Sequence, residues 1–270
     1  MPSIVPPPWD SQGDFYRDCM SKILLRAGVF IMAFYYLLLG HLIGDFVLQT
    51  DKIAENKSTH WKWNLLHVSV VTFCIFIFAS SFGKLLSAWI LINGFLHFLL
   101  DFYKNKICKF LHFSNLSGFL VDQFIHLLIL YGISLTAHYP GGPLLDFRSV
   151  KLLIMLIMIT SFSAVFTQFV LSSLFPREES RFFESGEKQL GIMTRINIFV
   201  IFYMAIAHSP YYLLLLTITF PPFILQFKQS WNRWMSLSHL AVKVILDTLI
   251  PALCIFLSVK GSILVFPRLF

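Results

Sequence analysis

Long apolar stretches alternate with short polar ones along most of the chain, and this pattern predicts a bundle of transmembrane helices. A helix needs about 20 mostly apolar residues to cross the hydrocarbon core of a bilayer. Six stretches come close to that length and carry few charges. They are Ile23–Gln49, Leu65–Phe82, Leu85–Tyr103, Gly118–Ala137, Val150–Phe175 and Leu237–Val259. The expected fold class is therefore all-α, a polytopic transmembrane helix bundle.

One further stretch, Ile196–Phe227, leaves the number of spans open at seven or eight. At about 1.5 Å per residue it is long for one crossing and short for two. Pro210 interrupts it, which favours either a kinked helix or a short hairpin. We expect the first four segments (23–137) to form a core bundle. A short, partly disordered tail (1–22) precedes this core, and the C-terminal transmembrane helices (138–270) follow it.

The composition excludes an ordinary soluble domain. The chain is 57% hydrophobic and 13% charged, whereas soluble domains are about 45–50% apolar and about 25% charged. Its net charge of +7 would also suit nucleic-acid binding. The basic residues, however, gather in short loops between apolar segments, where they orient helices and contact lipid headgroups. We therefore expect the lipid bilayer, and not a nucleic acid, as the partner.

Three basic loops orient the predicted bundle. The loops 50–64, 104–117 and 176–195 hold most of the Lys and Arg residues between segments. By the positive-inside rule these loops are cytoplasmic. The N-terminus then lies outside, although it also carries basic residues, which runs against the same rule.

Four acidic residues fall inside apolar segments, and three of them have a histidine four residues away. Residues at i and i+4 share a helix face, so each pair directs two ligand-type groups the same way. Another histidine stands near the start of the second segment. In an up-down bundle all these groups reach one level near the cytoplasmic leaflet. The set consists of His41, Asp45, His67, His97, Asp101, Asp122 and His126.

Charged groups inside a bilayer cost at least a few kcal/mol each, so they face the bundle interior and usually mark function. Mixed His and carboxylate ligands suit zinc, manganese or non-haem iron. All seven residues are therefore metal-ligand candidates, and Asp101 and Asp122 are also candidates for a catalytic base. Two alternatives stay open: a structural network of His–Asp hydrogen bonds, and a pathway for protons or ions.

The fourth intramembrane acid, Asp247, follows His239 and Lys243 at spacing four in the last segment. A Lys–Asp pair one turn apart can neutralise itself. We expect this stripe to lie outside the main site.

The run "HLIGDFVLQTDKIAENK", followed by His67, "HFLLDFYK" and "DQFIHLLIL", resembles a family of bacterial integral membrane proteins known only as domain of unknown function 3307. The resemblance covers about residues 35–135 and implies a bacterial inner membrane, but no activity. "GEKQLGIMTRINIF" is only loosely similar to the second-half element of that family, with Thr194 where an acidic residue is expected. More distantly, the arrangement is similar to membrane-bound proteins regarded as metal-dependent hydrolases.

Three functions compete. The first is a metal-dependent hydrolase of a lipid or lipid-linked substrate, in which Lys52, Lys57 or Lys104 attracts an anionic headgroup. The second is a proton- or cation-coupled transporter or channel that uses the same residues. The third is a membrane scaffold whose working part is the loop 176–188, "PREESRFFESGEK". The sequence leaves open whether the protein is an enzyme.

Overall fold

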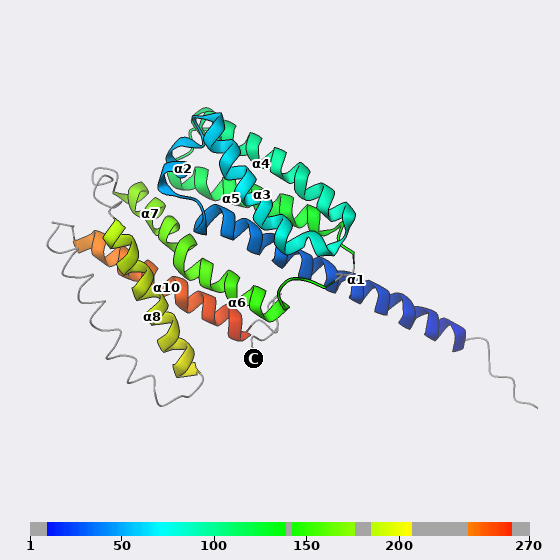
Figure 1. The fold of residues 1–270 in the computed structure, drawn as a ribbon. Coiled ribbons are helices and arrows are strands. Elements are labelled where there is room, and N and C mark those ends of the chain that lie inside the picture. Colours follow the sequence, from blue (N-terminus) through cyan, green and yellow to red (C-terminus); the bar gives the residue numbers. More distant parts are fainter. Residues whose placement is uncertain (1–9, 139–141, 176–184, 207–236, 261–270) are drawn as a thin grey trace, which may run out of the picture.

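The computed structural model describes residues 10–138, 142–175, 185–206 and 237–260, and every regular element in these ranges is helical (Figure 1). The predicted all-α class is thereby confirmed. A π-helical turn, η1 (Ile43–Val47), continues the first helix, and a 3-10 turn, η2 (Ser80–Phe82), continues the third. The helices of the first half are α1 (Asp10–Leu42), α2 (Asp51–Asn56), α3 (Trp61–Ala79), α4 (Lys84–Phe110) and α5 (Asn115–Ser134).

The second half begins with a long helix that a π-helical turn divides. The turn η3 (Met158–Phe162) joins α6 (Phe147–Ile157) to α7 (Ser163–Leu174). Two further helices, α8 (Ser185–Ile206) and α10 (Leu237–Lys260), are described. The choice between seven and eight spans depends on residues 207–236, which lie outside the described residues.

Among the described residues, five helices are long and apolar enough to cross a membrane, which makes the chain a multi-pass membrane protein. They coincide with the first five predicted segments. The first helix extends further than predicted, because α1 begins at Asp10 inside the expected tail. The five spans are Met20–Val47, Trp61–Phe82, Lys84–Phe110, Asn115–Ser134 and Phe147–Leu174.

The first four spans form a closed ring of neighbours. Helix α1 packs against α3 and α5, and α4 packs against the same two helices from the other side. A buried apolar core, which includes Leu37, Ile75 and Ile90, fills the ring. The α6–α7 helix packs outside the ring against α1 and α5, and α8 and α10 pack beyond it (Figure 1). The predicted core bundle of four helices is therefore present.

Two glycines let α1 and α3 approach each other closely, as small residues at a spacing of four permit. A Cβ atom on Gly40 would lie 2.5 Å from the Cα of Ile75. A Cβ on Gly44 would lie 2.6 Å from the Cα of Val71. Both neighbours are backbone atoms, so an alanine at either position would push the two helices apart. This close contact brings the end of α1 next to α3.

The sequence prediction was wrong about Arg195, which it placed in a basic loop (176–195). Arg195 lies in α8 and is only 2% exposed. Its guanidinium is paired with Asp247 of α10 at 2.5 Å, and its Nε donates a hydrogen bond to the carbonyl of Ile159 in η3. Arg195 therefore connects α8, α10 and η3 inside the bundle. It is not part of a basic loop that orients the helices. Lys243, predicted to neutralise Asp247, is also buried in α10.

Candidate metal centre

The residues predicted for the site come together at the end of the ring where α1 and α4 finish and α3 and α5 begin, beside α2 (Figure 1). Each of the four spans contributes. The contributions are His41 and Asp45 from α1 and η1, His67 from α3, His97 and Asp101 from α4, and Asp122 and His126 from α5.

Local signals set where these helices begin and how they present the site. The hydroxyl of Ser114 accepts a hydrogen bond from the backbone N–H of Ser117 (3.1 Å), which caps the start of α5. Gly83 forms the turn that leads into α4, with φ of +119°, a backbone conformation that other residues rarely adopt. At the end of α1, the N–H of Leu48 donates to the carbonyl of Ile43 across five residues (2.9 Å). Such π-turns are frequent at functional sites, and this one contains Asp45.

One group of possible metal ligands joins α1, α3 and α4. The Nε2 of His67 lies 2.9 Å from Oδ1 of Asp45, and the Nε2 of His97 lies 3.7 Å from the same oxygen. The two imidazole Nε2 atoms are 3.4 Å apart. One ligand atom from each of the three residues falls within 4.8 Å of the others, which is close enough to hold one metal ion.

A second group shares His97 and reaches α5. Oδ2 of Asp101 lies 3.5 Å from Nε2 of His97, and Oδ1 of Asp101 lies 3.9 Å from Nε2 of His126. The rings of His97 and His126 stack with their centroids 4.2 Å apart. Ligand atoms of these three residues also fall within 4.8 Å of one another. The centre therefore offers two overlapping positions for a divalent ion.

All of these side chains except that of Asp122 are fully buried. Their exposed fractions run from 1% for His67 and Asp101 to 6% for Asp45, and the side chain of Asp122 is 9% exposed. Buried carboxylates are costly unless a cation or hydrogen bonds compensate them. The centre thus needs positive charge.

Hydrogen bonds among the described residues do not fully compensate the buried ligand atoms. Several of them lie within 4 Å of an ionic partner but form no hydrogen bond with it. Such groups in a buried site call for an explanation such as a bound ion. They are Nε2 of His41, Oδ1 of Asp45, both oxygens of Asp101 and Nε2 of His126. Their convergence fits a cation better than a self-contained hydrogen-bond network.

Two predicted ligands lie at the edge of the centre and belong to neither group of three. His41 Nε2 is 3.6 Å from Oδ2 of Asp45, and its ring lies 5.3 Å from that of His126. Asp122 Oδ1 is 3.5 Å from Nε2 of His126. Both residues contact a ligand candidate, so they can orient it as partners of metal ligands commonly do.

Two lysine side chains also lie in the centre. The sequence pattern placed both in basic loops, as contacts for lipid headgroups. Lys57 Nζ lies 3.0 Å from Oδ2 of Asp101, and Lys104 Nζ lies 2.8 Å from Oδ2 of Asp122. Burial lowers the pKa of Lys57, but the carboxylates of Asp101 and Asp45 outweigh it and hold the pKa above its ordinary value. Lys57 is therefore an ammonium at neutral pH.

Two amides at the centre were also missed. Asn64 is fully buried, and its side chain donates to the carbonyl of Phe98 (2.9 Å), which ties α3 to α4. Gln123 donates to Oδ2 of Asp45 from α5 (3.4 Å). Gln123 stands directly after Asp122 in the sequence, and Asn64 stands three residues before His67, so both lay next to the residues already singled out.

Residues 33–154 match a known family, which is described as Protein of unknown function (DUF3307). This part, a little under half of the chain, is similar to that family. The matched range contains all seven predicted site residues together with Lys57 and Lys104, so the whole centre lies inside it. The predicted resemblance over about residues 35–135 lies inside the matched range, and the loosely similar run around Arg195 lies outside it. No curated protein and no solved structure matches the chain.

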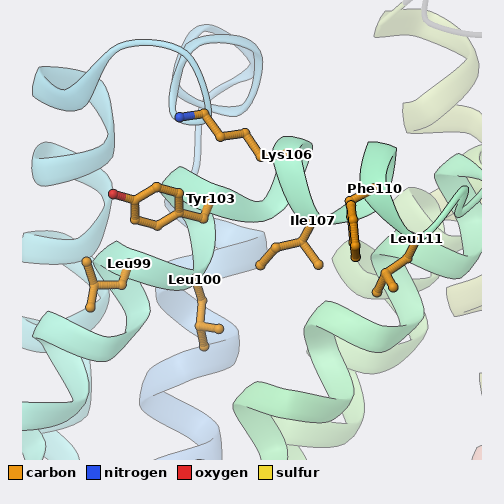
Figure 2. A pocket seen from close by; sticks show the side chains of 7 residues that line it. All are labelled: Leu99, Leu100, Tyr103, Lys106, Ile107, Phe110 and Leu111. Atoms are coloured by element: carbon orange, nitrogen blue, oxygen red, sulfur yellow. The ribbon is translucent and has the colours of Figure 1, made fainter.

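A groove of about 670 Å³ on α4 is separate from the centre. Figure 2 shows its lining, which is apolar or aromatic except for Lys106. The residues are Leu99, Leu100, Tyr103, Lys106, Ile107, Phe110 and Leu111. They occupy the face of α4 opposite to Asp101, so the groove is part of the apolar outer surface of the bundle and carries none of the ligand candidates.

Two other sequence predictions concern the second half. His239 lies in the first turns of α10, and Asp247 is paired with Arg195, so the paired end of this stripe belongs to a second polar cluster. The loop proposed for a scaffold function (176–188) lies mostly outside the described residues.

Proposed function

We propose that the protein is a metal-dependent hydrolase that acts on a lipid or lipid-linked substrate at the cytoplasmic leaflet of a bacterial inner membrane. The observation that carries the proposal is the pair of buried His/Asp groups, each with three ligand atoms within 4.8 Å of one another. Bundles of four helices commonly build catalytic metal sites from inward-facing carboxylates and histidines. Zinc, manganese and iron suit this mixed ligand set.

The residues divide by their contacts. Asp45, His67, His97, Asp101 and His126 would hold the ion, because their ligand atoms form the two groups of three. A bound divalent ion supplies a Lewis acid that polarises an ester or phosphoryl oxygen and activates water at neutral pH. In the hydrolysis, the water oxygen forms a bond to the ester carbon or phosphorus, and the bond to the leaving alcohol breaks. Asp122, outside both groups, would accept the proton of the water and return it to that alcohol.

The surroundings of the centre support a substrate that comes from the membrane. Lys52 lies over the ring of Trp63 (5.1 Å), and Lys62 lies over that of Trp61 (5.8 Å), at the start of α3. Tryptophan and lysine at a helix end are typical of the membrane–water interface. The centre is therefore expected close to the headgroups of one leaflet.

A proton or cation pathway through the ring has less support. Away from the centre, the buried residues of α1 that face the ring are apolar or aromatic, as Ala33, Tyr36 and Leu37 are. Other described residues of the ring core away from the centre, such as Ile75, Phe82 and Leu86, are also apolar. A relay needs ionisable groups at successive depths, whereas the buried His and Asp residues of the ring gather at one end.

An assay in proteoliposomes tests the proposal against the pathway. The full chain is reconstituted with mixed phospholipids, loaded with zinc or manganese, and followed for released fatty acid, headgroup or phosphate and for proton flux. We expect hydrolysis that a chelator abolishes, that is lost with bound metal in Asp101→Asn, and that survives in His60→Ala, whose side chain is exposed. Proton flux without hydrolysis, abolished in Asp101→Asn, would instead establish the pathway.

A further inference from the structure

Lys57 reaches the centre from outside the ring of four spans. It follows α2, the short helix that lies between η1 and α3 in the chain. Its Nζ is 3.0 Å from Oδ2 of Asp101 and 3.1 Å from Nε2 of His67. The side chain is only 14% exposed. Its ammonium is thus inserted among groups that would otherwise bind a metal ion.

The two atoms that Lys57 contacts belong to the two groups of possible ligands, His67 to one and Asp101 to the other. An ammonium donates to the lone pair of an imidazole nitrogen, and a metal ion needs the same lone pair. Two cations that share these ligands would also repel each other strongly in a buried site. The ammonium and a divalent ion are therefore alternative occupants of the centre.

The segment that carries Lys57 is held by few described contacts. In α2, Lys52 and Glu55 are exposed, and Ile53 is the buried residue of this helix. One hydrogen bond, from Asn105 to the hydroxyl of Ser58 (2.8 Å), ties the following turn to α4. Short exposed elements with few buried contacts open at low free-energy cost. This segment can therefore move without disturbing the ring.

We infer that Lys57 is a displaceable cation: it neutralises the centre in the absence of metal, and a divalent ion expels it together with the α2 segment. The inference rests on the metal site proposed above and adds its regulation. Metal loading then opens the end of the centre that α2 covers, so the ion is bound and the site becomes accessible in one event.

Selective labelling of lysine amines tests this displacement. The full chain in detergent is treated briefly with an amine-acylating reagent, with and without zinc, and each lysine is quantified by mass spectrometry alongside the zinc content. We expect Lys57 to be protected without zinc and to become several-fold more reactive with it. Lys109, which is exposed in the last turn of α4 and lies outside the α2 segment, serves as the internal control and should not change. In Asp101→Asn, Lys57 should be reactive without zinc.

A second variant keeps the inference independent of labelling chemistry. Lys57→Met preserves most of the side-chain volume but removes the competing charge. If the ammonium occupies the centre nine-tenths of the time or more, the variant should bind zinc at least about tenfold more tightly. Zinc bound stoichiometrically to a chain in which Lys57 stays protected, or an unchanged affinity in Lys57→Met, overturns the inference and leaves the metal site intact. A chain that binds no zinc removes both.

Discussion

At the scale of single residues, the carboxylates of Asp101 and Asp122 have different surroundings. Asp101 is buried among Lys57, His67, His97 and His126, and neither of its oxygens accepts a well-formed hydrogen bond from a described residue. The side chain of Asp122 is 9% exposed, against 1% for Asp101, and it is paired with Lys104. The first environment suits a ligand and the second suits a group that exchanges protons with bound water. Two aspartates on neighbouring helices thus have separable roles in the proposed reaction.

Replacing Asp122 should separate metal binding from catalysis. We expect Asp122→Asn to retain most of the bound metal but to lower the hydrolysis rate about 10²–10⁴-fold, the usual contribution of a general base. Metal content and rate are measured on the same preparation. Complete loss of metal in this variant would show that Asp122 is a ligand, and an unchanged rate would remove it from the mechanism.

At the scale of elements, the fit between α1 and α3 determines whether the ligands meet. Gly44 precedes Asp45 and lies against the backbone of Val71, one turn of α3 beyond His67. The spacing of four between Gly40 and Gly44 permits this close approach, and the sequence predicted the convergence of the His/Asp pairs from the alternating direction of the spans. Both features follow from periodicity, which a sequence displays directly.

Gly44→Ala should therefore damage the centre without touching a ligand. Its Cβ would clash with backbone, so we expect a loss of stability of about 1–3 kcal/mol, as overpacking usually costs, and a loss of metal. Gly28→Ala on the same helix is the matched control, because nothing lies within 4 Å of its Cβ. Thermal unfolding in detergent and metal content report the two effects. Equal behaviour of the two variants would contradict the packing argument.

At the scale of the whole molecule, two buried polar clusters occupy different parts of the bundle. The His/Asp centre lies within the ring of the first four spans, and the Arg195–Asp247 pair joins α8 and α10 to η3. The sequence did not predict the second cluster, because Arg195 stands at the edge of an apolar segment next to a charged loop. The insertion of Lys57 was also missed. The position of Lys57 depends on how the short helix α2 packs against the ring, and the periodicity of the sequence does not predict that packing.

The Arg195–Asp247 pair should stabilise the fold without contributing to metal binding. We expect Arg195→Met to destabilise the chain by about 3–5 kcal/mol, because it leaves Asp247 buried without this partner. The double variant Arg195→Met with Asp247→Leu should recover much of that loss. Both should keep the metal that the wild type binds. Unfolding midpoints in detergent together with metal analysis decide the matter, and loss of metal in the double variant would link the two clusters functionally.

The central claim is that imidazoles and carboxylates of the four-helix ring bind one divalent ion directly. X-ray absorption at the zinc edge, on the purified full chain loaded with zinc, tests this most directly because it reports the ligand atoms themselves. The account predicts stoichiometric zinc with at least two imidazole nitrogens at about 2.0–2.1 Å and oxygen ligands beside them. In His97→Ala it predicts fewer imidazole ligands or less bound zinc. Zinc coordinated without imidazole, or a well-folded chain that retains no zinc, would contradict it.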